Sequence, residues 1–390
     1  MKRLTCFLFA TAIFGAGVHP PVLWVRSQTE LSSNHSQPGS RVTAVVIQDY
    51  SGSGAFSIPM GSLVTGRVVK SSRKSQSSLL LKFESVSIAG HEFPLEAHVS
   101  EVDNARERVE PDGTILGLEE FRKRPGKVES LLLAAAFAHP AILGSVEAAK
   151  YVIREVKRPE VQYPAGTDIA LIVDEVPSGH CPVQIEKPDS TMPAPLARIF
   201  DQLPNRTTTK NQHVPADWIN LAFVGSRARL AQAFEVAGWS SAGELSLRAD
   251  FKTFMAVTEH HSYTSAPVFE FLLSGRPPEF VYQKQTNTFA KRHHIRIWST
   301  GQTWNGQPVW IASATHDIGI DFSLKAKTFA HQVDPNIDLE RLKIVDDLRF
   351  TRQVASISYM NRPFVPHTSK NATGDVIHTD GLMVTIVLNH

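Results

Sequence analysis

Two adjacent histidines and two arginines stand in a strand-like stretch, RHHIRIW at residues 292–298. Because side chains alternate between the two faces of a strand, His294, Arg296 and Trp298 share one face, and His293 shares the other with two isoleucines. A guanidinium and an imidazolium beside an aromatic ring can bind one phosphate or carboxylate. We therefore predict an anion site on the first face and a hydrogen-bonded core histidine on the second. A solvated strand face is the alternative for His294 and Arg296.

Two later stretches, ATHDIG and HQVDP, carry further histidines and aspartates at the ends of predicted strands. Consecutive strands tend to be neighbours, so these residues should come within reach of the first stretch. The predicted binding cluster is His294, Arg296, Asp317 and His331. A second group holds His293, His316, Asp334 and Trp298. Turn capping is the alternative for Asp317, and Asp334 with Pro335 is typical of an N-cap followed by the first residue of a helix.

The chemistry open to this cluster is limited. Histidine and aspartate from adjacent strands could converge on a metal, since three protein ligands suffice for a catalytic zinc site. The sequence contains no HExxH, no Cys–His framework, no GxSxG and no glycine-rich phosphate loop. We predict no cofactor and keep a metal ion as a second option. We favour a non-catalytic binding or assembly module, and the alternative is a metal-dependent or phosphate-directed hydrolase that uses this cluster.

The elements that must position these residues lie in residues 214–390. Strands are predicted in WINLAFVG, PEFVYQK, RHHIRIW, QPVWIASAT, TFAHQV and GLMVTIVLN. One helix should begin after an N-cap at Ser226 and end at Gly238, a second should follow the capping box SAGE at 241–244, and a third should cover DPNIDLERLKIVDDLRF. This pattern predicts an α+β domain with a mostly antiparallel sheet and helices on one side.

Residues 41–175 show short apolar runs in period two, cut by Gly, Pro and Ser, which is typical of a barrel or sandwich. The stretch IPMGSLVTGRVV at 58–69 is echoed by YPAGTDIALIVD at 163–174, so each should be a turn feeding a strand. An alanine-rich stretch at 128–156 predicts a helical insertion. Residues 176–213, rich in Pro, Ser and Thr, predict a linker with a short helix at 195–202.

The first residues resemble a secretory leader. Two basic residues precede an apolar run too short to span a bilayer comfortably, and small residues follow it. We predict a signal peptide over about 1–26, a linker over 27–40, and export to the periplasm or the outer envelope; an uncleaved anchor is the alternative. After cleavage Cys181 is the one cysteine, so no internal disulfide is expected.

The net charge of +2 gives no support to a nucleic-acid partner. We expect an envelope protein or an anionic envelope ligand instead, with peripheral membrane contact as an additional option. At 390 residues, the chain is long enough for two domains.

The motifs INLAFVGS, AGW, YTSAPV, LSGR, RHHIRIW, PVWIASATHDIGI and HQVDPNIDLER occur in one order over about residues 215–350, which resembles the LssY C-terminal domain. The resemblance implies a bacterial envelope protein linked to secretion, in a family whose members are often fused to membrane-spanning DedA-like or lipid-phosphatase-like modules. This chain lacks a recognisable phosphatase motif and a polytopic membrane segment, so no phosphatase activity is implied. Residues 41–175 resemble the β-barrel segments of TrbI-type conjugal-transfer proteins, which implies an envelope scaffold.

Overall fold

The computed structural model describes the chain except for a few segments. The described residues are 22–51, 56–73, 76–117, 160–175, 191–210, 213–241, 271–284, 291–323 and 328–389. The predicted helical insertion at 128–156, the helix after 241–244 and the first 21 residues of the predicted leader lie outside them. Within the described residues, no helix combines the length and the apolar character needed to cross a membrane.

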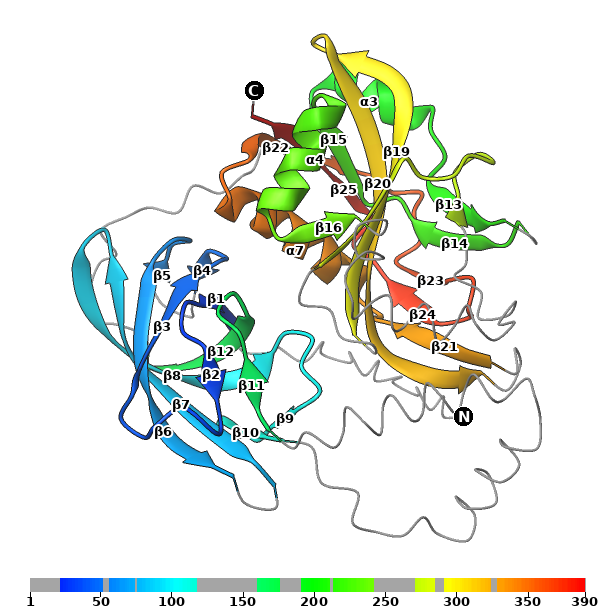
Figure 1. The fold of residues 1–390 in the computed structure, drawn as a ribbon. Helices are drawn as coiled ribbons and strands as arrows, with labels where there is room; N and C mark the ends of the chain where they lie inside the picture. Colours follow the sequence, from blue (N-terminus) through cyan, green and yellow to red (C-terminus); the bar gives the residue numbers. More distant parts are fainter. Residues whose placement is uncertain are drawn as a thin grey trace, which may run out of the picture.

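The N-terminal domain is a sheet that closes on itself (Figure 1). Its strands follow the order β6-β3-β1-β12-β8-β7, and β7 pairs back with β6, so the six form a barrel. They are β1 (Val22–Ser27), β3 (Arg41–Val46), β6 (Leu63–Ser72), β7 (Ser78–Ile88), β8 (His91–Val102) and β12 (Asp168–Glu175). Each pairs antiparallel with its neighbours, and alternate side chains fill one buried apolar core.

Shorter strands extend and cap this barrel. The strands β10 and β9 continue the sheet beyond β7, β11 pairs with β2, and β4 pairs with β5. Their bounds are β2 (Leu31–Ser32), β4 (Tyr50–Ser51), β5 (Ser57–Ile58), β9 (Arg108–Val109), β10 (Thr114–Leu116) and β11 (Gln162–Tyr163). Of the two architectures predicted for this region, the barrel is the one that forms.

The two echoed sequence stretches build the same turn twice. Gly61 and Gly166 both have left-handed backbone angles, with φ of +88° and +95°. In each turn a hydroxyl donates to the carbonyl of the proline three residues earlier, from Ser62 at 2.7 Å and from Thr167 at 2.8 Å. Each glycine N–H also donates to the end of the neighbouring strand. The prediction of a turn feeding a strand is therefore confirmed, and only glycine adopts this backbone without strain.

The boundaries predicted for the leader and the first linker are wrong. Residues 22–26 belong to β1, which lies between β3 and β12 and buries Leu23 and Val25 completely. In the predicted linker, Leu31 is also fully buried. The apolar alternation of β1 follows the apolar run of the leader directly, so hydropathy alone merges the two.

The C-terminal domain is built on a second large sheet, with the order β16-β18-β19-β20-β15-β25-β22 and with β21 paired to β20. All its pairings are antiparallel except β15–β25, which is parallel. Its strands are β15 (Leu221–Val224), β16 (Trp239–Ser241), β18 (Phe280–Lys284), β19 (Arg292–Trp304), β20 (Gln307–Ser323), β21 (Thr328–Val333), β22 (Val354–Asn361) and β25 (Leu382–Leu388). The α+β prediction with a mostly antiparallel sheet is confirmed.

Two smaller sheets accompany this one. The first has the order β14-β13-β17, and the second pairs β23 with β24. Their strands are β13 (Arg206–Thr209), β14 (Pro215–Trp218), β17 (Phe271–Leu272), β23 (Thr368–Lys370) and β24 (Val376–His378).

In the described part of this domain, the helices that cover the large sheet are α3 (Ala194–Asp201), α4 (Arg227–Val236) and α7 (Ile337–Phe350). The helices α4 and α7 pack in one apolar cluster with the sheet, and α3 packs in another that contains Trp298. Helices therefore lie on both faces, not on one as predicted. Leu196 and Phe200 of α3 are buried, so the second half of the predicted linker 176–213 is part of this domain.

Two of the predicted helix starts lie within the described residues, and their outcomes differ. The N-cap of α4 is Ser226, whose hydroxyl accepts from the backbone N–H of Arg229, as predicted. The N-cap of α7 is Asn336, not Asp334. The carbonyl of Pro335 accepts from the N–H of His378 at 2.6 Å. This contact holds the preceding loop against β24, so the helix begins further along the chain.

Candidate functional site

Three of the four residues in the predicted cluster meet on one face of β19 and β20. His294 Nε2 lies 3.2 Å from Asp317 Oδ1, and Arg296 donates to His294 Nδ1 at 3.3 Å. Arg296 forms an ion pair with Asp217 of β14 at 3.7 Å, a residue outside the predicted cluster. The partner was missed because Asp217 stands between strand signals in PADWINLAFV and gave no sign of facing β19.

This cluster is buried and compensated from within. Burial lowers the pKa of Arg296 and raises that of Asp217, and their opposite charges counteract both shifts. The guanidinium of Arg296 also lies 4.6 Å from the ring centroid of Phe271. Both nitrogens of His294 are in polar contacts, with Asp317 on one side and Arg296 on the other. These contacts occupy the imidazole nitrogens of His294 and the guanidinium of Arg296, which a substrate would need as hydrogen-bond partners.

Of the other predicted residues, Trp298 and Asp334 do not join this cluster. His331 lies on β21 opposite Ile320, and its side chain is outside the described residues. Trp298 is fully buried and donates its indole N–H to the carbonyl of Arg276 at 3.1 Å. Asp334 accepts from the N–H of Asn336 at 2.8 Å in the loop before α7.

The opposite face of β19 carries a different arrangement, around His293. His293 pairs across the strands with His316, and their rings stack with centroids 4.0 Å apart and planes at 16°. Its Nδ1 lies 2.6 Å from Glu340 of α7, and its Nε2 lies 2.9 Å from Asp103. Burial alone would lower the pKa of His293, but the two carboxylates raise it to about 10. His293 is therefore an imidazolium that donates from both nitrogens.

Asp103 comes from the other domain, in the loop after β8 of the barrel. Burial raises its pKa, but the charges of His293 and Lys343 outweigh burial and hold it well below its usual range. The next residue, Asn104, accepts from His316 Nε2 at 3.0 Å. Burial and the positive charge of His293 lower the pKa of His316 to about 3, so this second ring is neutral.

A chain of ion pairs continues from this point along the domain boundary. Lys343 of α7 lies 2.7 Å from Asp168 of β12, and Arg26 of β1 lies 2.6 Å from the same carboxylate. Arg26 also reaches Asp347 of α7 at 2.9 Å, and Lys284 of β18 lies 2.6 Å from Asp347. Burial lowers the pKa of Lys284, and burial of Asp347 is outweighed by its cations, which lower its pKa.

Helix α7 therefore presents one charged face to the barrel, with Glu340, Lys343 and Asp347 at spacings of three and four residues. Figure 1 shows this helix, in orange, on the side of the C-terminal domain that faces the barrel. At its end, Arg349 pairs with Asp49 of the barrel at 2.7 Å.

Comparison with known families identifies the domain on one side of this boundary. Residues 200–383 match the family model described as LssY C-terminus. This part of the chain is an LssY C-terminal domain. No curated protein matches the chain. The match begins within α3 and ends within β25, so it includes both the predicted cluster and α7.

The charges across the boundary are complementary. We call the connected ion-paired groups that run from Glu340 and His293 to Lys284 the boundary network, which contains four carboxylates and four cations; the pair of Arg349 with Asp49 is separate from it. The barrel supplies two carboxylates and one cation, Asp103, Asp168 and Arg26. The LssY C-terminal domain supplies two carboxylates and three cations, Glu340, Asp347, His293, Lys284 and Lys343. The barrel side is thus negative by one charge, the other side is positive by one, and the whole is neutral.

Three members of this region could hold a metal ion. Asp103, His293 and His316 each offer one ligand atom, and the three atoms lie within 4.8 Å of one another. However, both nitrogens of His293 already face carboxylates, and a metal would have to displace one proton. A metal lies in the plane of each imidazole that binds it, so two stacked rings 4.0 Å apart would also have to turn. The arrangement fits a proton better than a metal.

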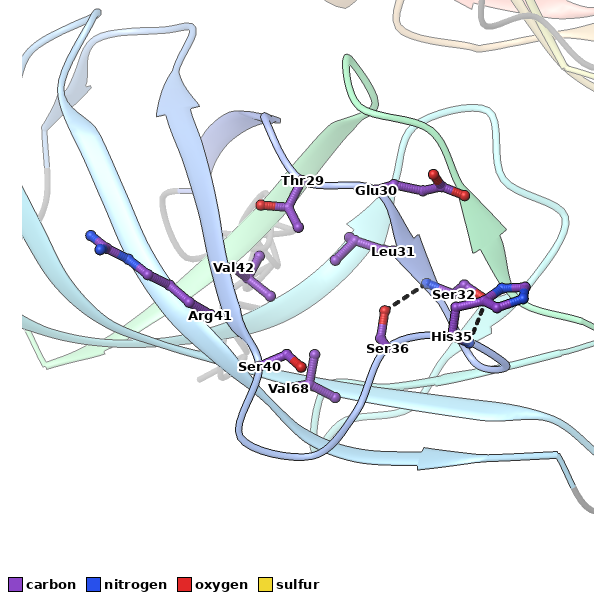
Figure 2. A pocket seen from close by; sticks show the side chains of 10 residues that line it. All are labelled: Thr29, Glu30, Leu31, Ser32, His35, Ser36, Ser40, Arg41, Val42 and Val68. Carbon is purple, nitrogen blue, oxygen red and sulfur yellow. Dashed lines mark hydrogen bonds between the residues drawn. The ribbon is translucent and has the colours of Figure 1, made fainter.

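A cavity of about 500 Å³ opens on the barrel between the β2–β3 loop and β6 (Figure 2). It contains Ser32 and His35, and Ser32 donates to Glu160 at 2.8 Å, which has the residue types of a catalytic triad. The geometry is different, because both Ser32 and Glu160 lie near the same nitrogen of His35, at 3.2 and 3.9 Å. A triad needs the two ring nitrogens for different partners. The Ser32 hydroxyl instead accepts two backbone N–H groups of its own turn.

Sequence reasoning missed most of the boundary network, although signals were present. Lone charges interrupt apolar strand patterns, as Asp168 does at the start of DIALIVD and Lys284 does at the end of FVYQK. In α7, Asp347 stands on the same face as apolar residues. Such charges are expensive to bury unpaired, so each one predicts a partner but does not say which.

Proposed function

We propose that this protein is a non-catalytic binding or assembly module of the bacterial envelope, in which the barrel and the LssY C-terminal domain act as one unit. The observation that carries this proposal is the boundary network. The charges on each side find their partners only when the two domains are docked, which favours one specific arrangement of the two. A rigid two-domain unit with fixed geometry suits a scaffold that holds partners at a defined distance.

The polar cluster on the other face of β19 supports a structural role over hydrolysis. A general base needs a nitrogen or carboxylate within hydrogen-bond reach of substrate. In His294 both nitrogens are committed to Asp317 and Arg296, and Arg296 is balanced by Asp217. These contacts favour positioning of β14 against the sheet.

Export follows from the leader-like first residues, with cleavage expected before Val22 so that β1 is kept. The partner we expect is an envelope protein or an anionic envelope ligand, and secretion is the process with which the family resemblance associates it. Cell fractionation with N-terminal sequencing tests this part. A mature N-terminus near residue 22 in the periplasmic fraction is expected; a full-length chain confined to the cytosol would contradict export.

The absence of catalysis is tested on the purified protein. We expect no turnover of phosphate mono- and diesters, with or without added divalent cations. The matched variants are His294→Ala and Thr300→Ala, the second being a partly buried hydroxyl on the same strand outside the cluster. Turnover by the parent and by Thr300→Ala that is lost in His294→Ala would replace the binding module with a hydrolase.

A further inference from the structure

One carboxylate of the barrel is held by a set of groups that all belong to the LssY C-terminal domain. His293 donates to Asp103 Oδ1 at 2.9 Å, and Lys343 lies 3.8 Å from Asp103 Oδ2. His316 stacks on His293 and contacts the adjacent Asn104. The Asp103 side chain is only 6% exposed, so water contributes little to its stabilisation.

These groups are held in place within their own domain. Glu340 fixes the orientation of His293 by accepting from its other nitrogen at 2.6 Å, and Asp347 lies 3.7 Å from Lys343 on the same helix. Cross-strand pairing of β19 with β20 fixes the stacked rings. Asp168 of the barrel also lies 2.7 Å from Lys343. None of these constraints involves Asp103 itself, so the donors should keep their positions in a full-length chain that lacks the Asp103 carboxylate.

From this geometry we propose that His293, His316 and Lys343 form a carboxylate-binding site, which the loop after β8 fills from within the same chain. The LssY C-terminal side of the boundary network is positive by one charge, which suits a single anion. Burial excludes water, and a charge-assisted hydrogen bond beside a second cation suits a carboxylate.

The loop does not use the site fully. Among the described residues, Asp103 Oδ2 is buried without a hydrogen-bond partner and has only the longer ion pair to Lys343. A carboxylate presented by a differently placed loop could turn to engage both His293 and Lys343. The partner class this site fits is therefore an Asp- or Glu-bearing loop; this extension to a partner rests on the proposed function, whereas the site itself does not.

Chemical rescue tests the site on the full-length protein. Asp103→Ala removes the carboxylate and leaves a space beside His293 and Lys343. We expect a lower melting temperature, by on the order of 10 °C. Sodium formate should then restore a large part of the loss in a saturable way, at constant ionic strength kept with sodium chloride. The parent protein should not respond, because its site is filled.

Three variants control the measurement. Asp103→Asn keeps the volume, so formate should not enter and the melting temperature should not recover. The double variant Asp103→Ala with His293→Gln lacks the main donor and should not respond either. Asp112→Ala removes an exposed aspartate of the same domain and should be insensitive to formate. If Asp103→Ala does not accumulate as folded protein, its refolding yield with and without formate replaces the melting temperature.

Two results would overturn the proposal. The first is an Asp103→Ala variant that formate and chloride affect equally, which would leave Asp103 a structural ion-pair partner only. The second is a parent protein that binds zinc stoichiometrically and loses stability in a chelator, since a metal would then hold Asp103, His293 and His316. Neither result bears on export, which fractionation tests separately.

Discussion

At the scale of single residues, some buried ionisable groups are surrounded by opposite charges, and others also lie close to charges of their own sign. The His293 imidazolium has a carboxylate on each nitrogen, whereas the Asp346 carboxyl has one cation and carboxylate neighbours. Burial is the main cause that raises the pKa of Asp346, Asp347 and Asp49 add to the increase, Arg349 counteracts it, and the net pKa is about 7. Removing the charge of His293 should therefore destabilise the protein, whereas removing the charge of Asp346 should stabilise it.

Asp346→Asn should stabilise the protein above neutral pH. The raised pKa means that the folded state binds more protons than the unfolded state between about pH 4 and pH 7. The stability that protonated Asp346 provides is present at low pH and is lost as pH rises through 7. The advantage of the asparagine variant should therefore grow over this window, to on the order of 2 kcal/mol.

Urea unfolding of the parent and of Asp346→Asn at several pH values measures this difference. Asp201→Asn, at an exposed aspartate at the end of α3, is the control and should follow the parent. An Asp346 variant whose difference from the parent stays constant from pH 4 to pH 8 would contradict the assignment.

Arg296→Met should lower the free energy of unfolding by about 3–5 kcal/mol, since it leaves Asp217 buried without its cation. Adding Asp217→Asn should recover a substantial part of the loss, because no uncompensated charge then remains. Chemical denaturation of both single variants and the double variant gives the coupling between them. Strictly additive effects would mean that the two side chains do not depend on each other.

At the scale of secondary structure, local signals predicted elements well and their ends less well. The alternation in RHHIRIW and the capping hydroxyl of Ser226 act within one element, so the sequence contains all the information they require. The start of α7 depends on a contact with β24, which lies some forty residues later in the chain. A sequence window cannot include that contact, so Asp334 was preferred over Asn336.

Asn336→Ala should lower stability by about 1 kcal/mol, because the backbone N–H of Asp338 loses its side-chain acceptor. Asp334→Ala serves as the comparison: its carboxylate accepts from Asn336 N–H in the loop outside the helix, and its loss should cost less. Thermal melts of the two variants side by side decide which residue is the N-cap. A larger loss in Asp334→Ala would reverse the assignment.

At the scale of the whole molecule, only part of the candidate site could be predicted from the sequence. The cluster of His294, Arg296 and Asp317 was predicted because its members lie on adjacent strands, and these three do meet. The boundary network joins residues from two domains, and the pairing of Asp103 with His293 spans 190 positions. Composition and periodicity carry no information about such a docking, so His293 was assigned to the core of one domain.

A chain that begins at residue 22 should fold, whereas one that begins at residue 27 should not. The longer deletion removes β1, whose neighbours β3 and β12 would lose their shared strand, and it also removes Arg26 from Asp168 and Asp347. Soluble yield and circular dichroism of the two products compare them directly. A well-folded product that starts at residue 27 would restore the original leader boundary.

The position of β1 also sets an order of events during synthesis. Its partner β12 follows roughly 140 residues later, and Arg26 waits for Asp347, which is 321 positions away. The strand β1 therefore emerges from the ribosome, or from a translocation pore, long before β12, the strand that completes its pairing. Contacts this distant in sequence slow folding, and unpaired strands are prone to aggregate in the meantime. The strand β1 thus needs protection until β12 has appeared, and the charge of Arg26 lacks Asp347 until α7 follows.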